Sequence, residues 1–208
     1  MQLVIGLAAA ILVAGMQCSA SAQEPNGGLA ARLMDDLMWG RGPIGGTFEL
    51  VDHAGRPRAD TDFRGKWLLI YFGYSYCPDI CPTDLQQIGL VIDRLGAAGE
   101  AVQPLFITVD PERDTAEHLS EYVPLFHPRL IGLTGSAEQI QRVARAYKVY
   151  YAKYPIGSPD YVVDHSSFIY LVDPGGRYVG FFPPGTSADR MVEMIEPRLP
   201  AASTGTSH

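Results

Sequence analysis

The 208-residue sequence predicts an α/β fold in which helices flank a central mixed sheet. Apolar runs typical of buried strands alternate with segments whose apolar residues recur at helical spacing, and this alternation defines the class. Two strand-like runs joined by a Pro-Gly-Gly turn come near the end, so part of the sheet should be antiparallel. With 47% hydrophobic and 19% charged residues, the composition is that of a globular protein.

The predicted strands are of two kinds. Residues 47–52, followed by a turn at Gly55, should form an added N-terminal hairpin, and the closing hairpin should pair two further runs. Continuous apolar runs indicate strands that are covered on both faces. These buried strands are expected at residues 66–72, 103–110 and 130–135, and the closing hairpin at residues 166–173 and 177–182.

The predicted helices lie between and after these strands. Their apolar residues recur three and four positions apart, and their ends carry capping residues. Ser136 and Gln139, for example, form a capping box. The helices are expected at residues 84–96, 115–126, 136–151 and 187–199.

The two ends of the chain are expected to lie outside the domain, which we place at residues 47–198. Residues 1–22 contain an apolar run shorter than the roughly 20 residues of a membrane span, which predicts a signal peptide or a short membrane anchor. A linker with a short helix should cover residues 23–46, and a disordered tail residues 199–208. The protein would then be exported or periplasmic, either free or anchored to the inner membrane. The net charge of −7 argues against nucleic acid as a partner.

Two cysteines follow the first buried strand, in the stretch YFGYSYCPDICPTDL. In α/β proteins, sites lie beyond the carboxyl ends of the strands, which is where Cys77 falls. We expect Cys81 to cap the next helix, with Pro82 at its first position and a lowered thiol pKa. A disulfide, a redox pair and a metal site all remain open. A purely structural disulfide is least favoured, because so short a loop stabilises a fold little.

Other conspicuous residues have simpler interpretations. The segment 110–115, DPERDT, is expected to form a turn into the next helix, with Arg113 pairing locally. His118 lies in a predicted helix among charged residues, so a surface or structural role is expected. Tyr74 and Tyr76 are candidates for lining a site near the cysteines.

Four long stretches together resemble the Sco/SenC family of copper chaperones. The first stretch consists of residues 45–55 and 62–85. The other three are residues 107–115, 132–151 and 161–176. The resemblance implies a thioredoxin-like fold and copper bound by the cysteines of a CxxxC motif and a distal histidine. Carried onto this sequence, the ligands would be Cys77, Cys81 and His165. Beside His165, Asp164 is a candidate carboxylate for orienting the site, with an acid on the exposed edge of a strand as the alternative.

The family's function is assembly of the copper site of cytochrome c oxidase subunit II. The resemblance therefore implies that subunit, or another copper enzyme, as the receiving partner, with a copper donor or a thiol reductant upstream. Two thiolates and an imidazole favour Cu(I) and would also accept Cu(II). The alternative is a thiol–disulfide oxidoreductase with Cys77 and Cys81 as its redox-active pair. Three residues between the cysteines, where thioredoxin-type motifs have two, favour the chaperone.

Overall fold

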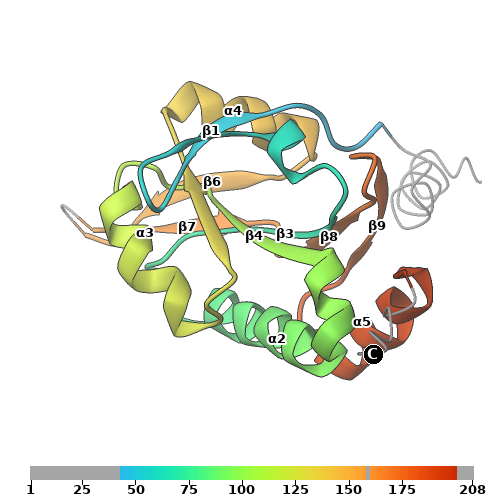
Figure 1. Cartoon of the computed structure of the whole chain (residues 1–208). Helices are drawn as coiled ribbons and strands as arrows, with labels where there is room; N and C mark the ends of the chain where they lie inside the picture. The colour runs from blue at the N-terminus through green and yellow to red at the C-terminus, as the bar shows by residue number, and fades with distance from the viewer. Residues whose placement is uncertain (1–42, 158–159, 201–208) are drawn as a thin grey trace, which may run out of the picture.

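A seven-stranded mixed sheet runs through the middle of the molecule (Figure 1). The computed structural model describes residues 43–157 and 160–200. β3, β4 and β5 are parallel neighbours at the centre, and their outer neighbours pair antiparallel to them. The sheet order is β2 (Pro57–Ala59), β1 (Glu49–Asp52), β5 (Ile131–Thr134), β4 (Val102–Thr108), β3 (Trp67–Gly73), β8 (Ile169–Val172) and β9 (Tyr178–Phe182). The predicted mixed sheet is confirmed, as are its opening hairpin β1–β2 and closing hairpin β8–β9.

Helices cover both faces of this sheet. In Figure 1, α2 and α5 lie side by side below it, and α4 lies above it near β1. The α-helices are α2 (Ile80–Leu95), α3 (Ala116–Tyr122), α4 (Ala137–Ala146) and α5 (Ala188–Ile195). Short 3₁₀ turns complete the chain at η1 (Asp60–Phe63), η2 (Gly96–Ala101), η3 (Val123–Leu125) and η4 (Glu196–Arg198). The α4 capping box is present as predicted: Ser136 accepts from the Gln139 backbone, and the Gln139 side chain accepts from the Ser136 N–H.

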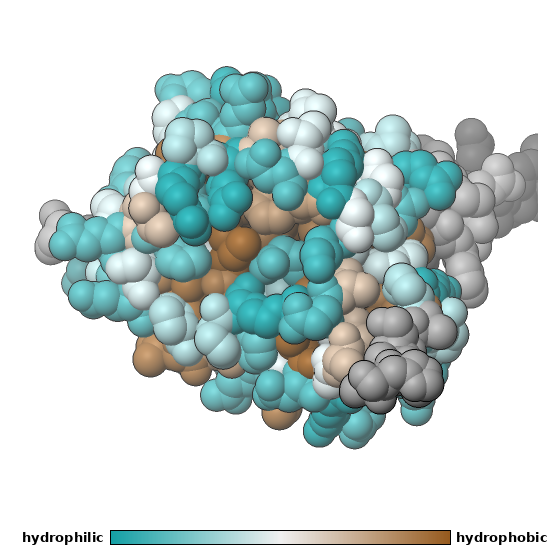
Figure 2. All heavy atoms as spheres, in the orientation of Figure 1, coloured by the Kyte–Doolittle hydropathy of each residue, from teal (hydrophilic) through white to brown (hydrophobic). Residues whose placement is uncertain are grey.

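The core follows the central strand. From Leu69 to Phe72 every side chain of β3 is fully buried, as expected for a strand covered on both faces. On the side of the molecule drawn in Figure 2, hydrophilic residues dominate the surface and hydrophobic residues show mainly between them. Within the described residues, no helix has both the length and the apolar character needed to cross a membrane. The predicted signal or anchor, most of the linker and most of the tail lie outside the described residues.

A second, two-stranded sheet was not predicted. β6 (Tyr151–Pro155) and β7 (Tyr161–His165) pair antiparallel with each other and with no strand of the main sheet. The predicted helix over 136–151 is therefore too long, since α4 ends at Ala146 and Lys148 adopts a left-handed φ of 58°. Tyr147, the residue after the helix, is buried, and its ring packs at a tilt against that of Phe72, with the centroids 5.4 Å apart.

The start of α2 also differs from the prediction. Asp79 is the residue before the first helical turn and Ile80 begins the helix, so Cys81 lies inside the first turn and does not cap it. Pro82 is accommodated at the third helical position, because the first N–H groups of a helix have no intrahelical acceptor to lose. The shift places the Cys81 side chain on the buried face of the helix.

Candidate metal centre

The three predicted ligands converge from three different elements. Cys77 follows β3, Cys81 lies in the first turn of α2, and His165 is the last residue of β7. One ligand atom from each lies within 4.8 Å of the other two, and Cys81 Sγ is 3.2 Å from His165 Nε2. Both cysteines are free thiols. Cys81 is fully buried, whereas Cys77 and His165 are half-buried, so the cluster has one inner and two outer members.

A glycine at the end of β3 makes room for the inner sulfur. A Cβ atom added at Gly73 would lie 3.0 Å from Cys81 Sγ, and closer still to the Tyr71 ring, at 2.9 Å. The ring of Phe106 would lie 3.1 Å away. Any side chain at this position would therefore push the sulfur or two buried rings out of place.

Two tyrosines and a carbonyl hold the imidazole of His165. The ring packs edge-on against Tyr74 and Tyr71, with centroid distances of 5.8 and 6.3 Å. His165 Nδ1 lies 3.2 Å from the carbonyl oxygen of Ser166. When Nδ1 donates its proton to that carbonyl, Nε2 is left with a free lone pair facing Cys81. Metal-binding histidines are commonly oriented in this way.

The two thiols differ in acidity because they interact with each other. A hydrogen bond from Cys81 lowers the pKa of Cys77 well below its ordinary value, and His165 acts in the same direction. The same hydrogen bond, together with burial, raises the pKa of Cys81. The direction is opposite to the lowered pKa predicted for Cys81, and Cys77 is the more acidic thiol of the pair. The pair can lose its remaining proton to bind a cation, or lose that proton and pass two electrons to an oxidant to form a disulfide.

Asp164 lies apart from the three ligands. Its side chain is exposed, and successive residues of a strand point to opposite faces, so it projects away from the face of β7 that carries His165. Its role in orienting the site stays a prediction. Of the two lining candidates, Tyr74 is buried beside the imidazole, whereas Tyr76 is 54% exposed and stacks on His118 at 5.3 Å.

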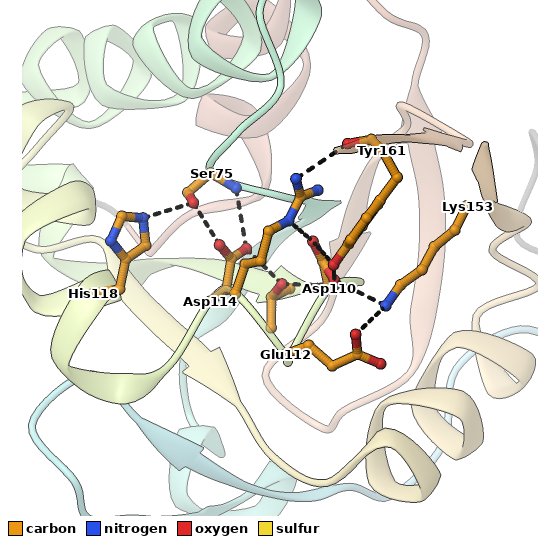
Figure 3. A network of polar contacts seen from close by, with 9 residues as sticks. Ser75, Asp110, Glu112, Asp114, His118, Lys153 and Tyr161 are labelled. Atoms are coloured by element: carbon orange, nitrogen blue, oxygen red, sulfur yellow. Dashed lines mark hydrogen bonds and ion pairs between the residues drawn. The ribbon is translucent and has the colours of Figure 1, made fainter. Parts of the chain in front are cut away.

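A polar network fixes the start of the cysteine loop (Figure 3). The carboxylate of buried Asp114 accepts from the Ser75 N–H at 3.0 Å, from Ser75 Oγ at 2.5 Å and from Thr108 Oγ1 at 2.6 Å. His118 Nε2 lies 2.7 Å from the same Ser75 hydroxyl. Burial raises the pKa of Asp114. The loop is thus tied to the end of β4, and His118 has the structural role that was expected.

Sequence reasoning missed the position of Asp84. Its side chain is fully buried and accepts from the Gly185 N–H at 3.0 Å. Burial raises the pKa of this carboxyl. The spacing of Asp84 could have indicated its burial, because Asp84 lies on the same helix face as Cys81, Leu85 and Ile88.

The fold and the cluster together define a thioredoxin-like protein with a site built from two thiols and one imidazole. The comparisons with known proteins agree, because the family model described as SCO1/SenC matches residues 38–199. The chain belongs to the SCO1/SenC family.

Similar structures and sequences support this membership. The crystal structure of Arabidopsis thaliana ScoI with copper bound is 44% identical with a TM-score of 0.68, covering 73% of this chain and 95% of that one. Bradyrhizobium japonicum ScoI with copper bound is 40% identical with a TM-score of 0.70, covering 74% and 98%. "Protein SCO2 homolog, mitochondrial" from Bos taurus is 49% identical over 159 residues, which is 75% of this chain and 60% of that protein. The chain thus spans about 60% of the length of this curated relative.

Proposed function

We propose that this protein is an exported copper chaperone that binds copper through Cys77, Cys81 and His165 and passes it to a copper enzyme. One observation carries the proposal, namely that two sulfur atoms and one imidazole nitrogen lie within 4.8 Å of one another. Thiolates are soft ligands that select Cu(I), and imidazole suits copper in either oxidation state. Cu(I) is therefore the favoured cargo, and Cu(II) would also be held.

The unequal burial of the ligands suits transfer as well as binding. Cys81 is fully buried and would bind the ion on the side that faces the protein core. Cys77 and His165 are half-buried and can be approached from solvent. Three protein ligands leave a coordination position open for a donor atom of the partner. The ion could then pass from one ligand set to the other without being released into water.

The receiving partner that the family implies is cytochrome c oxidase subunit II. A copper donor or a thiol reductant would act upstream. Two copper-bound Sco structures among the similar proteins support copper as the cargo. Several relatives are named as mitochondrial, and we propose for this chain the periplasm or an equivalent exported location, with residues 1–22 as signal or membrane anchor.

A second candidate function is thiol–disulfide exchange. The half-buried Cys77 has a lowered pKa and is free, with Cys81 beside it as a resolving thiol. A thiolate of this kind can attack a disulfide of the receiving enzyme, and Cys81 then attacks the mixed disulfide, which forms the Cys77–Cys81 disulfide and releases the enzyme's two reduced cysteines. The same pair would keep the receiving cysteines reduced before copper is delivered.

The test is a copper titration of the reduced protein under anaerobic conditions. We expect one copper per chain, and loss of tight binding in Cys77→Ser and in Cys81→Ser. His165→Ala should weaken binding by about tenfold or more while leaving the Cys77–Cys81 disulfide able to form. His53→Ala is the matched control, because His53 Nδ1 instead accepts from the Gly132 N–H.

Equal affinity in His165→Ala and in the parent chain would refute the three-ligand site. Absence of tight copper binding, combined with rapid reduction of a disulfide substrate, would make thiol exchange the main function.

A further inference from the structure

The proposed ligand His165 belongs to β7, a strand that does not pair with the main sheet. β7 pairs only with β6, and an isolated two-stranded hairpin is at best marginally stable in water. The cysteines, by contrast, lie at the end of β3 and in α2. The distance between His165 and the cysteines therefore depends on side-chain contacts between the β6–β7 hairpin and the rest of the domain.

One buried carboxylate gathers many of these contacts. Asp110, two residues after the end of β4, is fully buried and accepts from the Tyr161 hydroxyl of β7 at 2.8 and 3.1 Å. Lys153 of β6 lies 3.3 Å from Asp110 and 2.8 Å from Glu112. Figure 3 shows Lys153 reaching the two acids from the hairpin, with Tyr161 beside them. A buried charge requires such partners, so the hairpin is anchored where they meet.

Arg113 completes the anchor and also reaches the cysteine loop. Its Nε donates to Asp110 Oδ2 at 2.5 Å, and its Nη1 donates to the Tyr161 backbone carbonyl at 3.1 Å. The guanidinium lies over the Tyr161 ring, 3.8 Å from the centroid. It also lies over Tyr74 and Tyr76, at 5.6 and 4.8 Å, and these two residues lead into Cys77. The prediction of local pairing by Arg113 is confirmed for Asp110, but the side chain also bridges two distant segments.

We propose that Arg113 is a positioning residue that sets the distance from His165 to the two cysteines and thereby the copper affinity of the site. The inference rests on the proposed copper function. Arg113 touches Tyr74 on one side, whose ring packs against the imidazole, and Tyr161 on the other, four residues before His165 in the same strand. Arginine suits this task because its planar cation stacks on rings while it donates in a fixed direction, which lysine does not do.

The experiment compares Arg113→Lys with Arg58→Lys in the full chain. Arg58 is a close match, since its side chain is 26% exposed against 24% for Arg113, and its Nε also donates to a fully buried aspartate, Asp52, at 3.0 Å. It also lies over an aromatic ring, that of Phe63. It belongs to β2, at the far edge of the main sheet. Both variants keep the charge, and both should lose some thermal stability.

The expected results separate positioning from stability. Arg113→Lys should lower copper affinity about tenfold, whereas Arg58→Lys should leave it unchanged. In a His165→Ala background, Arg113→Lys should cause no further loss, because its effect passes through the imidazole. In the metal-free chain, amide hydrogen exchange of the β6–β7 hairpin should become faster in Arg113→Lys and stay the same in Arg58→Lys.

Unchanged hairpin exchange in Arg113→Lys would overturn the inference. So would an equal loss of copper affinity in the parent and His165→Ala backgrounds. Failure of the proposed function has a different signature, because His165→Ala alone would then leave copper affinity intact, whatever Arg113→Lys does.

Discussion

At the scale of single residues, the two thiols are chemically distinct although they lie side by side. Cys77 is half-buried with a lowered pKa, and Cys81 is fully buried with a raised one. The sequence places both cysteines in one loop but does not show which would be the thiolate. The difference comes from the direction of one hydrogen bond and from burial, which depend on where α2 begins.

This difference predicts a titration in two separated steps. In the reduced, metal-free chain, the pair Cys77–Cys81 should contain one thiolate at neutral pH, measured by its ultraviolet absorbance, and the second thiolate of the pair should form only in alkaline solution. Cys77→Ala should remove the neutral-pH signal. In Cys81→Ala the pKa of Cys77 should rise, because the hydrogen bond that lowers it is lost. Two thiolates at neutral pH, or none, would contradict this assignment.

At the scale of elements, the β6–β7 hairpin is the part that sequence reasoning did not find. The strands of the main sheet were predictable because their apolar runs are long, as in β3 and β4. The hairpin has short strands with mostly exposed or half-buried residues, and its first residue, Tyr151, falls inside the predicted helix over 136–151. The available signal was the sequence Gly-Ser-Pro-Asp, whose composition is typical of a turn, with tyrosines before it and the β-branched pair Val162–Val163 after it.

The two faces of this hairpin should respond differently to loss of a tyrosine hydroxyl. Tyr161→Phe removes a hydrogen bond to the buried carboxylate of Asp110, so local opening of β6–β7 should increase about tenfold or more in amide hydrogen exchange. Tyr154→Phe is the control on the same hairpin, because its hydroxyl meets only the exposed Tyr150 hydroxyl at 3.2 Å. Similar exchange rates in the two variants would show that Asp110 does not anchor the hairpin.

At the scale of the whole molecule, the α/β class and the meeting of Cys77, Cys81 and His165 were predictable, but the fit between layers was not. The alternation of apolar runs predicts which segments form the sheet. It does not reveal where a helix approaches a strand so closely that only glycine fits. Two such places are Gly73, against the sulfur of Cys81, and Gly132 of β5, where an added Cβ would lie 2.8 Å from Val123 of η3.

These glycines offer a test of whether the site and the fold can be separated. Gly73→Ala and Gly132→Ala should each lower the free energy of unfolding by about 1–3 kcal/mol, because both force atoms into a filled core. Only Gly73→Ala should also weaken copper binding and slow formation of the Cys77–Cys81 disulfide. Denaturant unfolding and copper titration of the two variants provide the measurements. Equal copper affinity in both would mean that the space at Gly73 serves packing alone.

The placement of His165 on a hairpin outside the main sheet has a consequence for the ancestry and engineering of this domain. Cys77 and Cys81 belong to the loop and the helix that follow β3 of the main sheet, whereas the proposed third ligand, His165, belongs to the separate β6–β7 hairpin. A hairpin with methionine or an acidic residue in place of His165 would offer a thioether or a carboxylate to the metal, while Cys77 and Cys81 stay in place. If copper binds as proposed, changes confined to this one segment should alter metal preference without altering the cysteine pair.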